Sequence, residues 1–337
     1  MQAMNSRDAM PTVSVVLSVR NGGRDLPKAL ETILNQTFRD FELIAINNGS
    51  TDGTREFLDG ITDPRVRVYH QEDRGLAAAL NHGISLAQGR YIARQDHDDL
   101  ADPSRLAKQV AFLDAHPEYG LVGTRAEIWL GDKPGGRFHD HPTEDAELRF
   151  ALLFDNYFVH SSVMMRKAAL DEVGVYSTDR SRQPPEDYEL WSRIARRFRV
   201  ANLPERLTVY REVPTSMSRE GVNPFMEKLV LISAENLAAA STGEAKPQAV
   251  HFDIACLVHG MPEKMSKKVN IEVMCAVLAK AGNNIFGDRS FGAEESPVAV
   301  WTRNVRRSYT IHKHGLQDLR NMVGRVRIKL RRLGLSI

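Results

Sequence analysis

Three acidic residues within four positions have the clearest potential for chemistry in this sequence. Residues 91–99 form a short β-rich run that ends in Asp96, His97, Asp98 and Asp99. Carboxylates this close repel one another, and burying them together disfavours their charged forms further. A hard divalent cation relieves the repulsion, and Mg²⁺ typically binds one or two carboxylates together with the phosphates of a substrate. A solvated acidic turn or a helix cap is the alternative explanation of these residues taken alone.

A second acidic pair, Glu186 and Asp187, stands between two prolines and the run Tyr188-Glu189-Leu190-Trp191. Asp favours the N-cap of a helix, and acidic residues favour its first turn. The pair therefore predicts a helix start. By itself this pattern does not distinguish a simple helix start from a functional carboxylate.

A parallel α/β sheet would bring residues 96–99, called the acidic turn below, together with other polar segments. Residues 13–19 are a short β-branched run bounded by turn residues, which predicts a buried strand. Strands and helices then alternate, and this order favours a parallel sheet flanked by helices. Ligands of such sheets bind outside the carboxyl ends of the strands, where residues 18–21, 47–52 and 96–99 should converge. The predicted helices are 26–34, 55–58 and 76–87, and the further strands are 41–46, 66–69 and 91–94.

The rest of the chain is less regular. Helices are predicted over 144–154 and 167–173, and strands over 162–165 and 203–211. Residues 222–299 are mainly helical in pattern, most clearly at 225–240 and 269–281, and offer no chemical motif. We therefore expect three parts: a catalytic domain over 11–215, a helical extension over 216–300 and a basic tail over 301–337.

Other motifs narrow the function classes. The turn after the first strand lacks Gly-x-Gly-x-x-Gly, and the chain has no P-loop Gly-Lys-Ser/Thr, which disfavours those two kinds of phosphate site. Two cysteines, Cys256 and Cys275, are too few for a disulfide framework. Residues 1–10 lack the apolar core of a signal peptide, and no apolar stretch is long enough to span a bilayer. We expect a cytoplasmic protein, soluble or peripheral at the inner face of the cell membrane.

The C-terminal tail is strongly basic. Residues 301–337 hold ten Lys and Arg residues against one acidic residue, Asp318, so the tail has a charge of +9 and the remainder −7. Apolar residues from Leu316 to Ile337 recur at three- and four-residue steps, which predicts a basic amphipathic helix. Such a helix fits an anionic membrane surface; docking on the catalytic domain and a homodimer are the alternatives. Nucleic-acid binding is not expected, because the tail lacks interleaved aromatic residues.

Several segments together resemble family 2 glycosyltransferases. Residues 13–21 and 34–44 resemble the opening of that family, and 48–54 looks like its second nucleotide-binding loop. The order continues with 81–84, 89–92, 96–99, 103–106, Gln109 and 186–191. The resemblance covers about residues 11–212. It implies the GT-A fold: a Rossmann-like, mostly parallel α/β sheet flanked by helices, here followed by a mainly helical C-terminal extension.

The resemblance also implies a role for each matching residue. Asp98 would be the ligand of a Mg²⁺ or Mn²⁺ ion that bridges the donor diphosphate, and Asp96 would contact the ribose or a metal-bound water. Asp187 would be the general base for the acceptor hydroxyl, with Glu186 as the second choice. The other donor-binding residues would be Ser18, Arg20 and Asn21 in the base and ribose pocket, Asn48 at the base edge, Asp52 stabilising its loop, and Arg74 and Asn81.

Two places depart from the family pattern. Asn47 and Asn48 stand where the family usually has Asp, whose carboxylate accepts a hydrogen bond from a uracil ring N–H. An Asn amide accepts a hydrogen bond through its carbonyl and also donates one. This implies a changed preference for the nucleotide base or weaker binding of it. Val213 stands near the position where many relatives have a His that can complete the metal site. Metal binding would then depend on Asp98, phosphates and water.

The sequence thus predicts a metal-dependent inverting glycosyltransferase. It would move a sugar from a nucleotide-sugar, UDP-linked, to a glycan or lipid-linked acceptor in surface polysaccharide synthesis. A sugar nucleotidyltransferase is one alternative, but it would bring a Gly-rich basic phosphate loop, which residues 21–24 only faintly resemble. A non-catalytic nucleotide- or glycan-binding subunit is the other, suggested by the two departures. The presence of both Asp98 and Asp187 argues against it.

Overall fold

The computed structural model describes residues 10–212, 225–287 and 296–313. The chain divides into two compact units. Unit 1 comprises residues 1–139, 158–178 and 197–216; unit 2 comprises 140–157, 179–196 and 217–337. The predicted amphipathic stripe from Leu316 to Ile337 and the departure at Val213 lie outside the described residues. None of the helices in the described ranges has the length and apolar character needed to cross a membrane.

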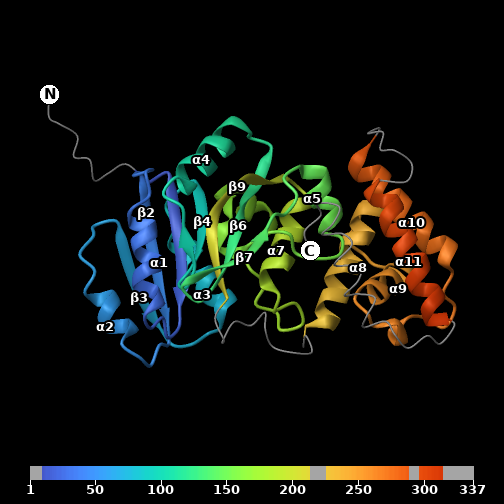
Figure 1. The fold of residues 1–337 in the computed structure, drawn as a ribbon, viewed down its shortest axis with the longest axis horizontal. Helices are drawn as coiled ribbons and strands as arrows, with labels where there is room; N and C mark the ends of the chain where they lie inside the picture. Colours follow the sequence, from blue (N-terminus) through green and yellow to red (C-terminus); the bar gives the residue numbers. More distant parts are fainter. Residues whose placement is uncertain (1–9, 213–224, 288–295, 314–337) are drawn as a thin grey trace. The chain divides into compact units, whose positions relative to one another are not determined.

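Unit 1 is an α/β domain (Figure 1). Its described strands form one nine-stranded sheet in the order β3-β2-β1-β4-β8-β6-β9-β5, with β7 paired to β6. The strands are β1 (Val13–Val19), β2 (Phe41–Asn48), β3 (Val66–Gln71), β4 (Tyr91–Asp96), β5 (Leu100–Ala101), β6 (Tyr119–Leu130), β7 (Lys133–His139), β8 (Met164–Arg166) and β9 (Arg199–Glu212). The helices are α1 (Asp25–Leu34), α2 (Thr54–Asp59), α3 (Leu76–Leu86), α4 (Arg105–Ala115), the 3₁₀ helix η1 (His160–Ser162) and α6 (Lys167–Val173).

The predicted strand–helix alternation over residues 13–96 is confirmed. β3, β2, β1 and β4 are parallel neighbours, as expected for strands joined by helical crossovers. The other half of the sheet is mixed: β8 is antiparallel to both β4 and β6, whereas β6 and β9 are parallel. The hairpin of β6 and β7 and helix α4 were not predicted.

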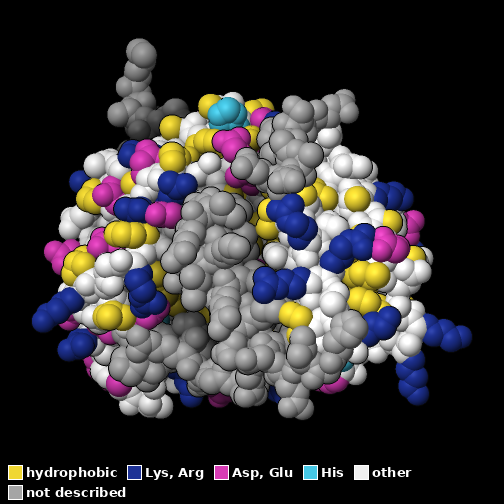
Figure 2. All heavy atoms as spheres, turned by 45° about the vertical axis from the view of Figure 1, so that its right-hand side comes forward, with side chains coloured by type: hydrophobic (Ala, Val, Ile, Leu, Met, Phe, Trp, Pro, Cys, Tyr) yellow, Lys and Arg dark blue, Asp and Glu magenta, His cyan; other side chains and the backbone are white. Residues whose placement is uncertain are grey.

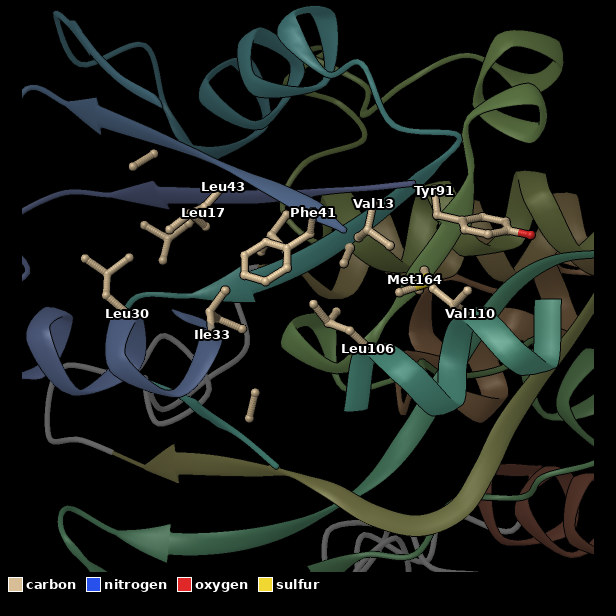
Figure 3. Close-up of a cluster of buried hydrophobic side chains, with 14 of the residues drawn as sticks. Val13, Leu17, Leu30, Ile33, Phe41, Leu43, Tyr91, Leu106, Val110 and Met164 are labelled. Carbon is tan, nitrogen blue, oxygen red and sulfur yellow. The ribbon is translucent and has the colours of Figure 1, made fainter. Parts of the chain in front are cut away.

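Alternating side chains of β1 build the core on both faces of the sheet. Val13, Val15, Leu17 and Val19 are buried in a cluster that α1 and α4 cover (Figure 3). Val16 faces the other way, where α3 approaches so closely that a Cβ on Gly83 would lie 2.5 Å from the Val16 side chain. Helices on both faces explain why all seven residues of β1 are buried, the serines at 14 and 18 included.

Unit 2 is mainly helical. It contains α5 (Asp145–Ala151), α7 (Glu186–Ala195), α8 (Met226–Thr242), α9 (Ala249–Val258), the 3₁₀ helix η3 (Pro262–Lys264), α10 (Ile271–Phe286) and α11 (Pro297–Lys313). Its core joins segments distant in the sequence: the Phe154 ring stacks on Trp301 of α11, with centroids 3.9 Å apart. The predicted helix start at Glu186 is confirmed, and Trp191 is fully buried. On the face of the molecule drawn in Figure 2, charged side chains of both signs are intermixed with hydrophobic ones.

Candidate active site

The carboxyl ends of the parallel strands gather the predicted donor-binding segments of unit 1. Ser18 lies beside Asp96 in the register of β1 and β4, and Val19 lies beside Asn47 in that of β1 and β2. Asn48 in turn is beside Gln71 at the end of β3. The expected convergence of residues 18–21, 47–52 and 96–99 at one edge is therefore confirmed.

Hydrogen bonds join the β1–α1 loop to the β2–α2 loop. Asn21 has a positive φ of 56°, a conformation that Asn tolerates better than most residues. Its Oδ1 accepts from the backbone N–H of Thr51 at 2.8 Å. Asp52 accepts from the N–H groups of Gly23 at 3.2 Å and Thr54 at 3.0 Å. The Thr54 hydroxyl and these N–H groups hold the pKa of Asp52 below its ordinary value, so this carboxylate is a fixed anionic anchor of both loops.

Asn48 is buried, and its amide is engaged by the loop that follows β3. Its Oδ1 accepts from Gln71 Nε2 at 2.7 Å and from the backbone N–H of Arg74 at 3.1 Å. Its Nδ2 donates to Asp73 Oδ1 at 3.0 Å. The other carboxylate oxygen of Asp73 pairs with Arg20 at 2.9 Å, and both of these side chains are partly exposed. The position predicted to face the base thus holds the loop after β3 in place.

The three carboxylates of the acidic turn have different surroundings. Asp96 forms an ion pair with the fully buried Arg94. Burial opposes its charge, but the guanidinium outweighs burial and lowers the pKa of Asp96. Asp99 turns inward and accepts from the Ser161 hydroxyl and from the backbone N–H of Arg211. Burial, together with the charges of Asp96 and Asp98, raises the pKa of Asp99 well above its usual range.

Asp98 is the carboxylate of this turn best suited to a cation. It is half-buried, and no other side chain in the described ranges donates a hydrogen bond to it or pairs with it. Burial and the neighbouring Asp96 raise the pKa of Asp98, so a cation would relieve an existing electrostatic cost. Within the described residues no cluster of three His, Cys, Asp or Glu side chains could hold a metal. The residues fit an ion held by one protein carboxylate and completed by substrate oxygens and water.

A series of hydrogen-bonded polar side chains extends from Asp96 through Arg94. Arg94 Nε lies 3.3 Å from His160 Nε2, which is also 2.9 Å from the Tyr176 hydroxyl. Burial and the Arg94 charge lower the pKa of His160 to about 3, so its neutral ring accepts hydrogen bonds rather than acting as a proton carrier. Asn81 fixes the far end, because its amide pairs with the backbone N–H and C=O of Tyr176.

In unit 2, the two residues predicted as candidates for the general base are the first two residues of α7. Asp187 Oδ2 accepts from Asn156 Nδ2 at 2.7 Å, and its Oδ1 accepts from the backbone N–H of Tyr188 at 2.7 Å. Glu186, the first residue of the helix, is buried. Sequence reasoning did not identify Asn156 or Arg94 as contributors. Arg94 had a signal, since residues two apart on a strand share a face and Asp96 follows it by two.

Comparison with known proteins gives the family. The model of Glycosyl transferase family 2 matches residues 14–174. The Bacillus subtilis protein EpsE, which is named as a glycosyltransferase, is 34% identical to this chain over 229 residues. The match covers 66% of this chain and 81% of EpsE. The glycosyltransferase GlyG of Streptococcus pneumoniae is 46% identical to this chain over 137 residues. This match covers 39% of this chain and 44% of GlyG.

A solved structure shares the fold. TarS of S. aureus, residues 1–349 in complex with UDP-GlcNAc, superposes with a TM-score of 0.57 at 16% identity, covering 90% of this chain and 92% of that one. This likeness agrees with the GT-A architecture expected from the sequence, with its helical C-terminal part. Taken with the family match and the relatives, it leads to one assignment: the chain is a glycosyltransferase and belongs to Glycosyl transferase family 2.

Proposed function

We propose that this glycosyltransferase uses a UDP-linked sugar as its donor. It transfers the sugar with inversion onto a hydroxyl of a glycan or lipid-linked acceptor in surface polysaccharide synthesis. The observation that supports this most is the register that sets Ser18 beside Asp96 while Asp98, two residues on, has no side-chain partner within the described residues. TarS, which shares the fold, was solved with UDP-GlcNAc, and this supports UDP as the nucleotide.

The donor nucleotide would bind along the loops after β1, β2 and β3. Ser18 and Asn21 would line the base and ribose pocket, with the exposed Arg20 guanidinium stacking on the base. Asn48 would act through the loop that it holds rather than by direct contact. Arg74 is exposed, and no described residue pairs with its guanidinium, which leaves this cation for the donor phosphates.

Asp98 would hold a Mg²⁺ or Mn²⁺ ion, which when bound offsets the negative charge that develops on the departing diphosphate. Asp96, kept ionised by Arg94, would contact the ribose or an ordered water.

At the other end of the transfer, Asp187 would accept the proton of the acceptor hydroxyl as that oxygen attacks the anomeric carbon. A positioned base of this kind typically contributes about a hundred- to ten-thousandfold. Glu186 is the second candidate for this role. Attack on the face opposite the diphosphate inverts the anomeric centre and needs no covalent intermediate.

A thermal-shift panel tests the donor and the metal together. UDP, GDP, CDP and dTDP would be added with and without Mn²⁺ to the wild type, to Asp98→Ala and to Asp171→Asn, a control at an exposed position of α6. Because ligands that bind the native state raise its stability, we expect a metal-dependent shift with UDP that Asp98→Ala loses and Asp171→Asn keeps. A shift without metal would count against Asp98 as the ligand. No shift with any nucleotide would favour a non-catalytic subunit.

A further inference from the structure

Arg211, near the end of β9, is almost completely buried at 1% exposure and contacts the acidic turn directly. Its backbone N–H donates to Asp99 Oδ1 at 2.8 Å. Its Nη1 donates to the backbone carbonyl of Asp98 at 3.1 Å. Two successive residues of the turn are thus bound by one residue that lies more than a hundred positions later in the chain.

The same guanidinium also contacts two other elements of unit 1. Its Nε donates to the carbonyl of Gly131, and its Nη2 donates to Asp132 Oδ1, at 2.9 and 2.6 Å, in the β6–β7 turn. Nη2 also lies 2.9 Å from Asp25 Oδ1 at the start of α1. Arg211 therefore joins the acidic turn, the hairpin turn and the first helix, and two carboxylates balance its buried charge.

The acidic turn is held from a second side as well. Gln95 Nε2 donates to the carbonyls of Asp96 at 3.1 Å and Asp99 at 2.8 Å. The backbone on both sides of Asp98 is thus bound, whereas its carboxylate has no side-chain partner within the described residues. A side chain held only through its backbone takes its position from whatever fixes that backbone, and here Arg211 is the charged member of that support.

We propose that Arg211 is a positioning residue for the metal site: by binding the Asp98 carbonyl and the Asp99 carboxylate, it sets where the Asp98 carboxylate meets the cation. This inference rests on the proposed role of Asp98. Lysine cannot replace Arg211, because an ammonium lacks the planar fork of five N–H donors that reaches three elements together. Loss of a group that orients a metal ligand typically weakens metal binding about 10- to 100-fold.

The test measures Mn²⁺ binding rather than activity. The full chain with saturating UDP would be titrated with Mn²⁺ and free Mn²⁺ read by electron paramagnetic resonance, for the wild type, Arg211→Lys and Arg166→Lys. Arg166 is a matched control, because its guanidinium also donates to backbone carbonyls, those of Tyr119 and His116, but does not contact the acidic turn. We expect the Mn²⁺ dissociation constant to rise about 10- to 100-fold in Arg211→Lys and to stay within about threefold in Arg166→Lys.

Two comparisons make the result decisive. A melting temperature lowered equally in both variants, with Mn²⁺ binding weakened only in Arg211→Lys, supports a positioning role over a merely structural one. If Arg211→Lys does not fold, Asp132→Asn removes one of the two negative charges beside the guanidinium, at a partly exposed site, and should weaken Mn²⁺ binding in the same direction. Unchanged Mn²⁺ binding in the variant that folds overturns the inference. A wild type that binds no Mn²⁺ with UDP instead overturns the proposed role of Asp98.

Discussion

The side-chain amide of Asn156 donates a hydrogen bond of 2.7 Å to Oδ2 of Asp187, at the start of α7. Asn156 precedes Asp187 by 31 positions, so this contact is made by the fold. The amide restricts the carboxylate to one orientation, while the N–H of Tyr188 occupies the other oxygen. The fold therefore fixes the orientation of the carboxylate that we propose as the general base.

Replacing Asn156 should therefore slow sugar transfer without weakening the binding of the donor. We expect Asn156→Ala to lower kcat about tenfold, equivalent to ~1.4 kcal/mol, with donor KM unchanged, because the carboxylate loses its orientation. Steady-state kinetics would measure both constants. We expect Asp187→Asn to lower kcat about a hundred- to ten-thousandfold. The control Asn283→Ala, at an exposed position of α10, should have the kcat and KM of the wild type. Full activity in Asp187→Asn would move the base assignment to Glu186.

A carboxylate at position 48 should disturb the donor pocket of this chain. Asn48 Nδ2 lies 3.0 Å from Asp73 Oδ1, so Asn48→Asp would set two acidic groups in contact and replace a hydrogen bond by repulsion. We expect weaker UDP binding and a lower melting temperature. The double variant with Asp73→Asn restores one donor and one acceptor and should recover both properties. Calorimetry of UDP binding checks this, and additive effects of the two substitutions would contradict it.

His259 should make unit 2 sensitive to acid. Burial lowers the pKa of His259 to about 4, and its Nε2 lies 2.7 Å from the Ser233 hydroxyl. Between about pH 6.5 and 4 the unfolded chain binds a proton at this ring and the folded chain does not. The free energy of unfolding therefore falls on acidification, by about 1.4 kcal/mol per pH unit from this group. Above pH 6.5 the ring is neutral in both states and the effect is absent.

Urea unfolding at several pH values would check the His259 prediction. His259→Gln keeps a polar partner for Ser233 but does not titrate, so its free energy of unfolding should fall less steeply than that of the wild type between pH 6.5 and 4. At pH 7.5 the two slopes should agree. Parallel curves over the whole range would show that His259 is protonated equally in both states.

The Phe154–Trp301 stack should be a main support of unit 2. Phe154 is 1% exposed and its ring lies 16° from the plane of the indole. We expect Phe154→Ala to lower the free energy of unfolding by about 3–5 kcal/mol, because the cavity also removes contacts from α11. Phe154→Leu should cost less, since it refills part of the volume. Chemical denaturation measures the difference, and equal stability of both variants would contradict a packing role.

The first half of the fold could be predicted because its signals are local. β1 and β2 are short, mostly apolar runs followed by turn residues, and α1 has apolar residues three and four positions apart. The β6–β7 hairpin escaped prediction because β7 has mostly exposed residues and three of its seven are Pro or Gly. Its pairing with β6 is decided by tertiary hydrogen bonds, which leave no apolar periodicity in the sequence.

The candidate site divides in the same way. Residue types and their order along the chain were enough to place Ser18, Asn48 and Asp98 at the carboxyl edge of the sheet and to indicate the family. Which polar group each one meets could not be predicted. Asn48 engages the loop after β3, and Asp98 is left without a side-chain partner in the described chain while the carbonyl of its backbone meets Arg211.

The sequence alone thus determined the parallel core and the edge where polar residues gather, because strand and helix preferences and strand endings are local properties. Tertiary structure decided the surroundings of each carboxylate in the acidic turn. Arg94 lowers the pKa of Asp96, Asp99 is buried against Ser161, and the Asp98 carboxylate has no side-chain partner among the described residues. The reason is physical: the charge state of a carboxylate depends on its burial and on nearby charges in space, and those neighbours come from distant parts of the chain.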